Sequence, residues 1–375
     1  MLKIALLGST GSIGVQTLNV VRRNPDKFKI VSLAAGSNQD LFIEQVKEFT
    51  PAVATLTNSI DVKEYKNTQF FFGENSFTNA VIDQADVVVV ALVGFKGIIA
   101  VLQAIKQGKD ICLANKESLV VGGDLVMRLA KEKGVNIYPI DSEHSAIWQA
   151  LSFDFNKPFN KIILTASGGA FRDYDLNALQ NVKAKDALKH PNWLMGNKIT
   201  IDCATMVNKA FEVIEAKWLY NTSFDKISVI IHRESIIHSM VEYNDGSVIA
   251  QMSYPTMEIP IALALCPNER LVSNVNSLDF AKLKSLTFLD MDKQKYPCFD
   301  LVVNAGKKGG CYPAVANGAN EMAVELFLKD KISYQDIYKG IDTALNKFNG
   351  QCFGDYQCYE NADKFARQCV KELFK

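Results

Sequence analysis

The stretch Lys3–Gly14, KIALLGSTGSIG, decides how this chain begins to fold. An apolar run, Ile4–Leu7, passes directly into glycines at positions 8, 11 and 14, and a helical pattern follows at once. A strand, a glycine turn and a helix start in this order predict a phosphate cradle, because glycines let a pyrophosphate approach the backbone and the helix offers free N–H groups. The spacing is G-x-x-G-x-x-G rather than the commoner G-x-G-x-x-G, so a tight turn without a ligand is the alternative.

Further apolar runs recur through the first 140 residues and alternate with helical patterns such as GIIAVLQAIKQG. The runs cover 29–35, 52–56, 86–92, 110–114 and 135–140. Continuous Val-rich runs between helices predict a parallel sheet that is covered on both faces. We therefore expect an N-terminal Rossmann-like, doubly wound α/β domain. The second run ends AAGSN without the carboxylate that NAD-specific members carry, which favours NADP.

Composition excludes several classes of protein. Lys plus Arg (41) balance Asp plus Glu (41), and no basic block stands out, so we expect no nucleic-acid partner. No stretch has the pattern of a signal peptide, and no apolar run approaches the roughly 20 residues of a membrane helix, so we expect a cytoplasmic protein without a membrane partner. The eight cysteines form no C-x-x-C pair, which favours reduced thiols.

Two carboxylates, Asp141 and Glu143, directly follow the last apolar run in the stretch YPIDSEHSAIW. If the chain stays extended, both project to the same side, and two oxygen ligands suit Mg²⁺ or Mn²⁺ better than Zn²⁺. The alternative is that Ser142 or Asp141 caps the helix SAIWQAL, with Glu143 in its first turn, where negative charge is favoured. The pattern alone leaves both interpretations open.

The preceding apolar run, 110–114, ends in LANKES. Because ligands bind beyond the carboxyl ends of parallel strands, Asn115, Lys116 and Glu117 should lie at the same sheet edge as Asp141.

Two loops further along the chain could hold and cover a substrate. SGGAF, Ser167–Phe171, can bind a phosphate through its hydroxyl and its backbone amides, although a plain turn is the alternative. KHPNWLMGNK, residues 189–198, combines turn formers with the apolar Trp193 and Met195. Such a loop is typical of a flap that excludes water from a reaction, or of a loop that its tryptophan attaches to the core.

A helical pattern follows in TMVNKAFEVIEAKWL and places Asn208, Lys209 and Glu212 within one turn of each other. An ordinary solvated helix face is the alternative. Apolar runs at 226–232 and 247–253 then predict an antiparallel part of the same domain.

Together and in this order, these motifs resemble the 1-deoxy-D-xylulose 5-phosphate reductoisomerase family. The resemblance covers nearly the whole chain and includes LGSTGSIG, LANKESLV, PIDSEHSAI, ASGGAFR, HPNWLMGNKITIDCATMVNKAFEVIEA, IIHRESIIHSMVEYNDGS and YPTMEIPI. It implies an NADPH- and metal-dependent enzyme that rearranges and reduces 1-deoxy-D-xylulose 5-phosphate to 2-C-methyl-D-erythritol 4-phosphate for isoprenoid precursors. It also implies a homodimer.

The resemblance assigns roles to individual residues. The divalent cation, Mg²⁺ or Mn²⁺, would be bound by Asp141, Glu143 and Glu212, and either Lys116 or Glu143 would transfer the proton. The sugar phosphate would contact Lys116, Ser142, Glu143, Ser167, His190, Trp193, Cys203, Asn208, Lys209 and Glu212. NADPH would lie against Thr10, Gly11, Ser12, Ile13, Gly36, Ser37, Asn38, Asn115, Glu117, Gly196 and Met257.

Three positions depart from the family pattern. Cys203 stands where a serine usually contacts the phosphate, and a thiol is a poorer donor. Ser37 stands where a lysine or arginine is often found, which weakens the contact with the 2′-phosphate of NADP. Ala166 stands where glycine is frequent. Two other functions share the first domain, a different NADP oxidoreductase such as a semialdehyde dehydrogenase and a non-enzymatic NADP sensor, but neither needs three carboxylates.

The length of the chain, 375 residues, suggests several domains. We expect an NADPH-binding domain at 1–140, an α+β catalytic domain at 141–267, a linker at 268–299 and a small helical domain at 300–375.

Overall fold

The computed structural model describes residues 1–193, 195–267, 269–350 and 354–375. The chain divides into two compact units, which are described separately. Unit 1 comprises residues 1–118, 126–145 and 256–275, and unit 2 comprises 119–125, 146–255 and 276–375. Each unit is thus built from three separate pieces of the chain.

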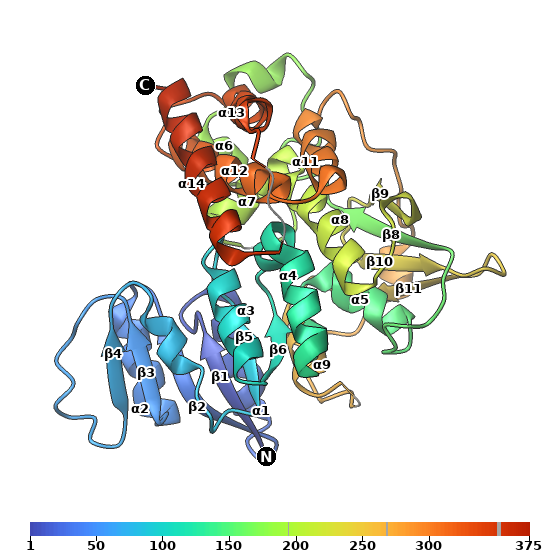
Figure 1. Ribbon diagram of the computed structural model, residues 1–375. Helices are drawn as coiled ribbons and strands as arrows, with labels where there is room; N and C mark the ends of the chain where they lie inside the picture. The colour runs from blue at the N-terminus through green and yellow to red at the C-terminus, as the bar shows by residue number, and fades with distance from the viewer. Residues whose placement is uncertain (194, 268, 351–353) are drawn as a thin grey trace. The chain divides into compact units, whose positions relative to one another are not determined.

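Within the described residues, unit 1 contains a seven-stranded parallel sheet in the order β4-β3-β2-β1-β5-β6-β7 (Figure 1). Its strands are β1 (Leu2–Leu7), β2 (Phe28–Ala35), β3 (Val53–Leu56), β4 (Gln69–Phe72), β5 (Val87–Val90), β6 (Asp110–Leu113) and β7 (Ile137–Pro139). The strand order reverses at β1, whose neighbours are β2 and β5. The predicted doubly wound sheet is confirmed, and the carboxyl ends of β1 and β5 mark its ligand crevice.

Helices cover this sheet because its central strands are apolar on both faces and buried along most of their length. They are α1 (Ser12–Arg23), α2 (Gln39–Phe49), η1 (Ser76–Ala80), α3 (Gly97–Lys106) and α9 (Glu258–Leu265). Helix α4 (Glu117–Lys133) belongs to unit 1 except for residues 119–125, and α5 (Ser142–Ala150) begins here and ends in unit 2. The edge strand β4 was not predicted, because its sequence QFFF is short, only partly buried and preceded by a polar segment.

Helix α9 belongs to unit 1 although it lies far along the sequence from the other residues of that unit. Its Ile261 and Leu265 belong to the same hydrophobic core as Ile4 of β1. The carbonyl of Ala264 accepts a hydrogen bond from the Cys112 thiol of β6, with 3.2 Å between the sulfur and the oxygen. The core of the nucleotide-binding sheet therefore includes residues that lie beyond position 255.

Unit 2 contains a four-stranded sheet in the order β11-β10-β8-β9 within the described residues. The strands are β8 (Lys161–Ala166), β9 (Ile227–Ile231), β10 (Ile237–Glu242) and β11 (Val248–Met252). Strand β11, in the predicted run 247–253, runs antiparallel to β10, as predicted. Strand β10 itself was not predicted, and it is antiparallel to β8 as well. The antiparallel prediction was wrong for β9, which pairs parallel with β8, because a long helical crossover connects these two strands.

The remaining helices belong to unit 2, and those near the C-terminus pack together around α12 (Figure 1). They are η2 (Ala178–Asn181), α6 (Ala184–Ala187), α7 (Asn197–Thr205), α8 (Val207–Leu219), η3 (Phe224–Lys226), α10 (Phe280–Leu283), α11 (Pro297–Lys308), α12 (Tyr312–Leu328), α13 (Tyr334–Lys347) and α14 (Tyr356–Leu373). This confirms the predicted helical C-terminal region. Among the described residues, no helix combines the length and the apolar composition that crossing a membrane requires.

The cysteines do not all follow the expectation of reduced thiols. Six of those in the described ranges are not in disulfides, namely Cys112, Cys203, Cys266, Cys298, Cys311 and Cys369. Cys358 is disulfide-bonded, so the expectation fails at this position. Sequence spacing alone does not reveal such a bond, because its pairing depends on the fold.

Candidate active site

The loop after β1 exposes the residues that the sequence predicts to bind a cofactor. Strand β1 is buried from Ile4 onward, whereas Thr10–Ile13 are half-buried or exposed. Gly8 has a φ of 93°, and a Cβ at this position would lie 2.4 Å from the carbonyl oxygen of Ala91, so only glycine fits. Helix α1 begins at Ser12, and the described structure shows no side chain capping it. Its first N–H groups are therefore available to an anion, as in a phosphate cradle.

The other predicted cofactor residues outside the β6–α4 segment follow β2, precede α9 or precede α7. Gly36, Ser37 and Asn38 follow β2 and are exposed. At the far side, the N–H of Met257, which precedes α9, donates to Gln16 Oε1 in the first turns of α1 at 3.3 Å. The structure therefore brings Met257 to α1, the helix that follows the loop after β1. Gly196, the last predicted contact, precedes α7 in unit 2.

Asn115 connects the carboxyl ends of two strands in unit 1. Its Nδ2 donates to the carbonyls of Leu92 and Gly94, each at 3.0 Å, and to Glu117 Oε2 at 3.1 Å. The side chain of Asn115 is thus engaged within the protein, and it fixes the start of α4, where Lys116 and Glu117 lie.

Lys116 and Asp141 form a buried ion pair in unit 1. The distance from Lys116 Nζ to Asp141 Oδ2 is 2.5 Å, and the two side chains are 7% and 12% exposed. His144 Nδ1 lies 3.7 Å from the same oxygen. Burial raises the pKa of Asp141, but the charge of Lys116 and the nearby His144 outweigh this effect and hold the pKa well below its usual range. Asp141 is therefore already an anion, as a metal ligand must be.

The extended conformation considered for Asp141 and Glu143 was wrong. Strand β7 ends at Pro139 and α5 begins at Ser142, so Glu143 lies in a helix, as the alternative expected. A metal-binding role for the two carboxylates stays a prediction. Glu143 lies in the first turn of α5, where its carboxylate accepts a hydrogen bond from Ser142 Oγ at 2.5 Å. The favourable helix N-terminus explains why this arrangement is preferred to an extended chain.

Asn208, Lys209 and Glu212 form a buried cluster on α8. Their exposed fractions are 8%, 4% and 0%, so the alternative of a solvated helix face is wrong. Asn208 Nδ2 donates to Glu212 Oε1 at 2.5 Å, and Lys209 Nζ forms an ion pair with Glu212 Oε2. Glu212, like Asp141, is thus a candidate metal ligand that is paired with a lysine. The resemblance assigns this lysine, Lys209, to the substrate.

The SGGAF loop lies against the end of α7. Gly169 has a φ of 70°, and a Cβ there would lie 2.4 Å from the carbonyl oxygen of Cys203. This contact places the backbone of Cys203 beside the loop. Ser167 Oγ accepts a hydrogen bond from the Gly169 N–H at 3.2 Å and lies 3.0 Å from His190 Nε2. Three predicted substrate residues of unit 2 are therefore neighbours.

The contacts of His190 define which ring nitrogen carries its proton. Nδ1 accepts hydrogen bonds from the backbone N–H groups of Asn192 at 3.2 Å and Trp193 at 3.0 Å, so Nδ1 is unprotonated. In the neutral ring Nε2 then carries the proton and donates it to Ser167 Oγ. The Ser167 hydroxyl accepts two hydrogen bonds and can direct its own hydrogen at an anion. The ring of Trp193 packs edge-on against His238, with 6.0 Å between the ring centroids.

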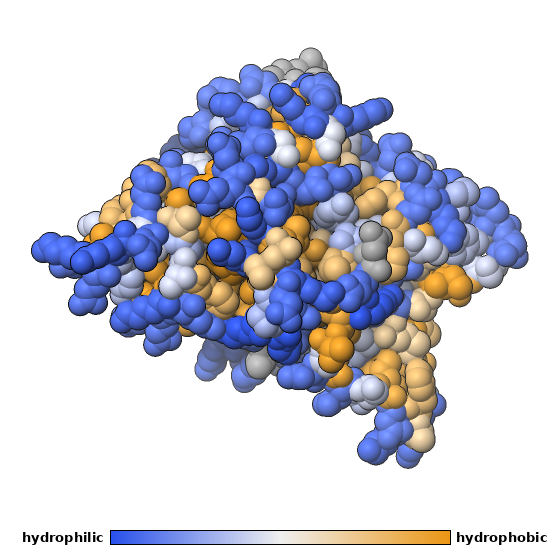
Figure 2. Space-filling model, turned by 90° about the horizontal axis from the view of Figure 1, so that it is seen from below, coloured by the Kyte–Doolittle hydropathy of each residue, from blue (hydrophilic) through white to orange (hydrophobic). Residues whose placement is uncertain are grey.

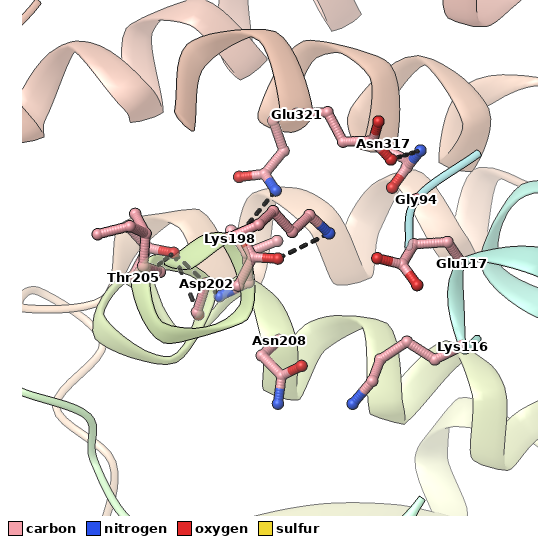
Figure 3. Close-up of polar contacts among 12 residues, drawn as sticks. Gly94, Lys116, Glu117, Lys198, Asp202, Thr205, Asn208, Asn317 and Glu321 are labelled. Carbon is pink, nitrogen blue, oxygen red and sulfur yellow. Dashed lines mark hydrogen bonds and ion pairs between the residues drawn. The ribbon is translucent and has the colours of Figure 1, made fainter. Parts of the chain in front are cut away.

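Another buried ion pair, which the sequence analysis did not identify, lies on α7. Lys198 Nζ is 2.8 Å from Asp202 Oδ2, and Figure 3 shows the lysine reaching along its helix to this carboxylate. Asn320 Nδ2 of α12 donates to Asp202 Oδ1 at 2.8 Å. Buried Asp202 thus connects α7 to α12. His144 was missed as well, although its spacing of three residues from Asp141 was a usable signal.

Comparisons with known proteins show the family of the chain. Models of 1-deoxy-D-xylulose 5-phosphate reductoisomerase and of its C-terminal domains match residues 4–123, 137–220 and 252–369. The 1-deoxy-D-xylulose 5-phosphate reductoisomerase of Acaryochloris marina is 46% identical over 360 residues, which cover 94% of this chain and 90% of that protein. The chain belongs to the 1-deoxy-D-xylulose 5-phosphate reductoisomerase family.

Other reductoisomerases extend the similarity to the full length of the chain. That of Pelodictyon phaeoclathratiforme is 46% identical over 380 aligned positions and covers 100% of both chains. The reductoisomerase of Zymomonas mobilis solved with NADPH has a TM-score of 0.92, 35% identity and coverage of 100% of this chain and 99% of that one. A reductoisomerase solved with NADPH, fosmidomycin and magnesium has a TM-score of 0.93, 38% identity and coverage of 99% and 98%.

Proposed function

We propose that this enzyme uses NADPH and a divalent cation to convert 1-deoxy-D-xylulose 5-phosphate into 2-C-methyl-D-erythritol 4-phosphate. Family membership supports this function, and related reductoisomerases have been solved with NADPH and with magnesium. The observation that carries the proposal is the pairing of buried carboxylates with lysines, Asp141 with Lys116 in unit 1 and Glu212 with Lys209 in unit 2. A general NADP-binding protein has no need for either pair.

The donor set of the chain fits a hard cation. Asp141, Glu143 and Glu212 offer only carboxylate oxygens, which Mg²⁺ and Mn²⁺ prefer. We propose that these three residues hold the cation, which when bound would polarise the substrate carbonyl and lower the pKa of the neighbouring hydroxyl. Lys116 and Lys209 would then no longer neutralise these carboxylates and would be available to the substrate. Lys116 or Glu143 would move the proton of the hydroxyl.

We propose that the anion of the substrate binds at the SGGAF loop. Ser167 is the main donor, because its hydrogen is not used by His190 or Gly169. Asn208 and Lys209 begin α8 and supply an amide and a positive charge. The phosphate takes no part in bond-making, but its binding energy holds the reacting end of the sugar in place. Trp193 would exclude water from that end.

We propose that NADPH binds along the carboxyl edge of the parallel sheet. The pyrophosphate would lie at the N-terminus of α1 beside Thr10–Ile13, and the ribose end beside Gly36–Asn38. Asn115, Glu117, Gly196 and Met257 complete the proposed set of contacts. Because Ser37 has no positive charge, the 2′-phosphate depends on neutral donors, so NADPH should be favoured over NADH less strongly than by relatives with a cation there.

We also propose that the enzyme is a homodimer that uses the edge of the unit 2 sheet formed by β11. Strand β11 lies at this edge, and its Val248 and Ile249 are exposed. Figure 2 shows hydrophobic patches exposed among hydrophilic residues on the face that it presents. An apolar edge strand is a liability unless another chain covers it. Light scattering should give a dimer for the natural chain and a smaller mass for Ile249→Lys; a monomeric natural chain would refute the proposal.

The cytoplasmic location stays a proposal. The six cysteines that form no disulfide agree with a reducing compartment, whereas the disulfide at Cys358 does not. Cell fractionation with an antibody against the chain would test it, and recovery outside the cytoplasmic fraction would contradict it.

The loss of NADPH absorbance tests the catalytic proposal directly. Purified protein is mixed with 1-deoxy-D-xylulose 5-phosphate and NADPH, with added Mg²⁺, with added Mn²⁺ or with a chelator. We expect oxidation only when both the sugar phosphate and a cation are present, and Glu212→Gln should abolish it while NADPH still binds. Oxidation that is indifferent to the chelator favours an ordinary NADP oxidoreductase, and binding without oxidation under any cation favours a sensor.

A further inference from the structure

The carbonyl oxygen of Arg233 joins two segments of the candidate anion site in unit 2. Asn192, at the base of the flap, donates to it through Nδ2 at 2.7 Å. Arg172, directly after the SGGAF loop, donates to it through Nη1 at 2.9 Å. A carbonyl oxygen has two lone pairs, so these two donors use its full capacity. The resemblance assigns neither Asn192 nor Arg172 a role in the site.

Each donor residue also makes other hydrogen bonds, either within its own segment or, for the Asn192 amide, to the turn that contains Arg233. Arg172 Nη1 donates to the carbonyl of Ser167 at 3.3 Å. The amide of Asn192 also donates to Ser235 Oγ at 2.7 Å, and its backbone N–H donates to His190 Nδ1 at 3.2 Å. Since Ser167 Oγ and His190 Nε2 are themselves 3.0 Å apart, the hydrogen bonds form a closed ring through the shared carbonyl.

The turn that provides this carbonyl is firmly held. His232 is fully buried, and its Nε2 accepts hydrogen bonds from the backbone N–H groups of Ile236 at 3.2 Å and Ile237 at 3.1 Å. The ring of His232 stacks on Phe288, with 5.1 Å between the centroids. The turn is thus a fixed support to which two loops are attached.

We propose that Asn192 and Arg172 are positioning residues, which fix the flap base to the SGGAF loop through the Arg233 carbonyl and so aim the Ser167 hydroxyl at the substrate phosphate. The identity of this phosphate rests on the proposed function, whereas the hydrogen bonds do not. When either donor is lost, the other loop stays attached to the turn, but the separation of Ser167 and His190 is no longer fixed. A displacement of about 1 Å at a site can cost about 100-fold in rate.

The first test needs no turnover. The N–H of Gly169 donates to Ser167 Oγ, so its hydrogen exchange reports on the SGGAF loop. Asn192→Asp replaces the donating amide by a carboxylate that cannot donate to a carbonyl. We expect exchange at Gly169 to accelerate by about tenfold, the equivalent of one ordinary hydrogen bond. Unchanged exchange in a variant with a native circular dichroism spectrum would overturn the proposal.

Ser235→Ala is the matched control. It removes the other hydrogen bond of the Asn192 amide but leaves the Arg233 carbonyl with both donors. Exchange at Gly169 should therefore stay within about twofold of the natural protein, because the shared carbonyl is still occupied. Equal acceleration in Ser235→Ala and Asn192→Asp would mean that any loosening of the flap disturbs the loop, and the proposal would be rejected.

Steady-state kinetics provide the second test. Asn192→Asp and Arg172→Met should each raise KM for 1-deoxy-D-xylulose 5-phosphate by about 10- to 100-fold. The double variant should be no worse than the poorer single variant, because the same connection is broken in each. Asn192→Gln, which keeps the amide, should recover part of the loss. Effects that multiply in the double variant would refute the connection.

The two tests also separate this proposal from the proposed function. A protein that never oxidises NADPH with the sugar phosphate but shows the expected exchange at Gly169 would keep the positioning role and refute the activity. Turnover of the natural protein together with unchanged exchange at Gly169 in Asn192→Asp would support the activity and refute the positioning role.

Discussion

Replacing Lys209 by methionine should destabilise the metal-free protein and make a divalent cation more stabilising. The ammonium of Lys209 contacts the carboxylate of Glu212, and both side chains are almost completely buried. Breaking a buried ion pair by removing one partner costs about 3–5 kcal/mol, because it leaves an uncompensated charge. Asn208 still donates to Glu212 at 2.5 Å, and methionine keeps most of the aliphatic volume, so we expect about 3 kcal/mol.

Urea unfolding measures this loss. With a slope of about 2 kcal/mol per molar urea, a loss of about 3 kcal/mol lowers the midpoint by about 1.5 M. A cation at 100 times its Kd stabilises the folded protein by about 2.7 kcal/mol. Mg²⁺ or Mn²⁺ should therefore restore most of the midpoint in Lys209→Met, and its Kd should be lower than in the natural protein, where the cation competes with the ammonium.

Lys198→Met is the matched control. The Lys198–Asp202 pair has the same elements, a buried carboxylate, a lysine and an asparagine donor, but lies outside the proposed metal ligands. The loss of stability in Lys198→Met should be smaller, since the lysine is 19% exposed. The cation should stabilise this variant no more than it stabilises the natural protein. Equal restoration of both variants, or an unchanged midpoint in metal-free Lys209→Met, would refute the reasoning.

Three further variants test other parts of the structure. Gln45→Met removes the hydrogen bond from Gln45 Nε2 to the carbonyl of Ser9 at 3.0 Å. KM for NADPH should therefore rise about three- to tenfold while KM for the sugar phosphate is unchanged. Equal rises in the two KM values would contradict a local effect on the glycine loop. Gly169→Ala places a Cβ 2.4 Å from the carbonyl oxygen of Cys203 at a φ of 70°, so the urea midpoint should fall by the equivalent of about 1–3 kcal/mol, and a midpoint equal to that of the natural protein would show that the loop relaxes freely. The pKa of Asp141 is lower in the folded than in the unfolded protein, so its stabilisation is complete above about pH 4 and is lost as the pH falls further. In metal-free protein the urea midpoint should therefore fall more steeply below pH 4 than in Asp141→Asn, and parallel slopes would contradict the pair.

Local patterns made much of unit 1 predictable. The order of strand, glycine turn and helix at Lys3–Gly14 depends on neighbouring residues only, and Val-rich runs identify buried parallel strands. Edge strand β4 was not predicted, because a short, half-exposed strand gives a weak pattern in the sequence. The start of α5 at Ser142 was ambiguous, since a carboxylate after a strand suits both a helix N-terminus and a metal site.

Tertiary environment explains what the sequence could not reveal in unit 2. Asn208, Lys209 and Glu212 look like a solvated helix face, and only the packing of other elements around α8 makes them buried. The parallel pairing of β9 depends on the path of the helical crossover, which a run of apolar residues does not encode. The contacts of Asn192 and Arg172 with the Arg233 carbonyl join segments up to 61 residues apart. The domain boundaries expected at 140, 267 and 299 stay predictions.

The late arrival of α9 in unit 1 matters while the protein is being synthesised. A ribosome releases the chain from its N-terminus, so all the strands of the parallel sheet emerge before Ile261 and Leu265 exist. Until then the apolar surface of α1, β6 and β7 against which α9 packs is open to solvent or to a chaperone. Expression of residues 1–140 alone should accordingly give an aggregation-prone fragment, and translation pauses shortly before α9 should be harmful to the yield of folded protein.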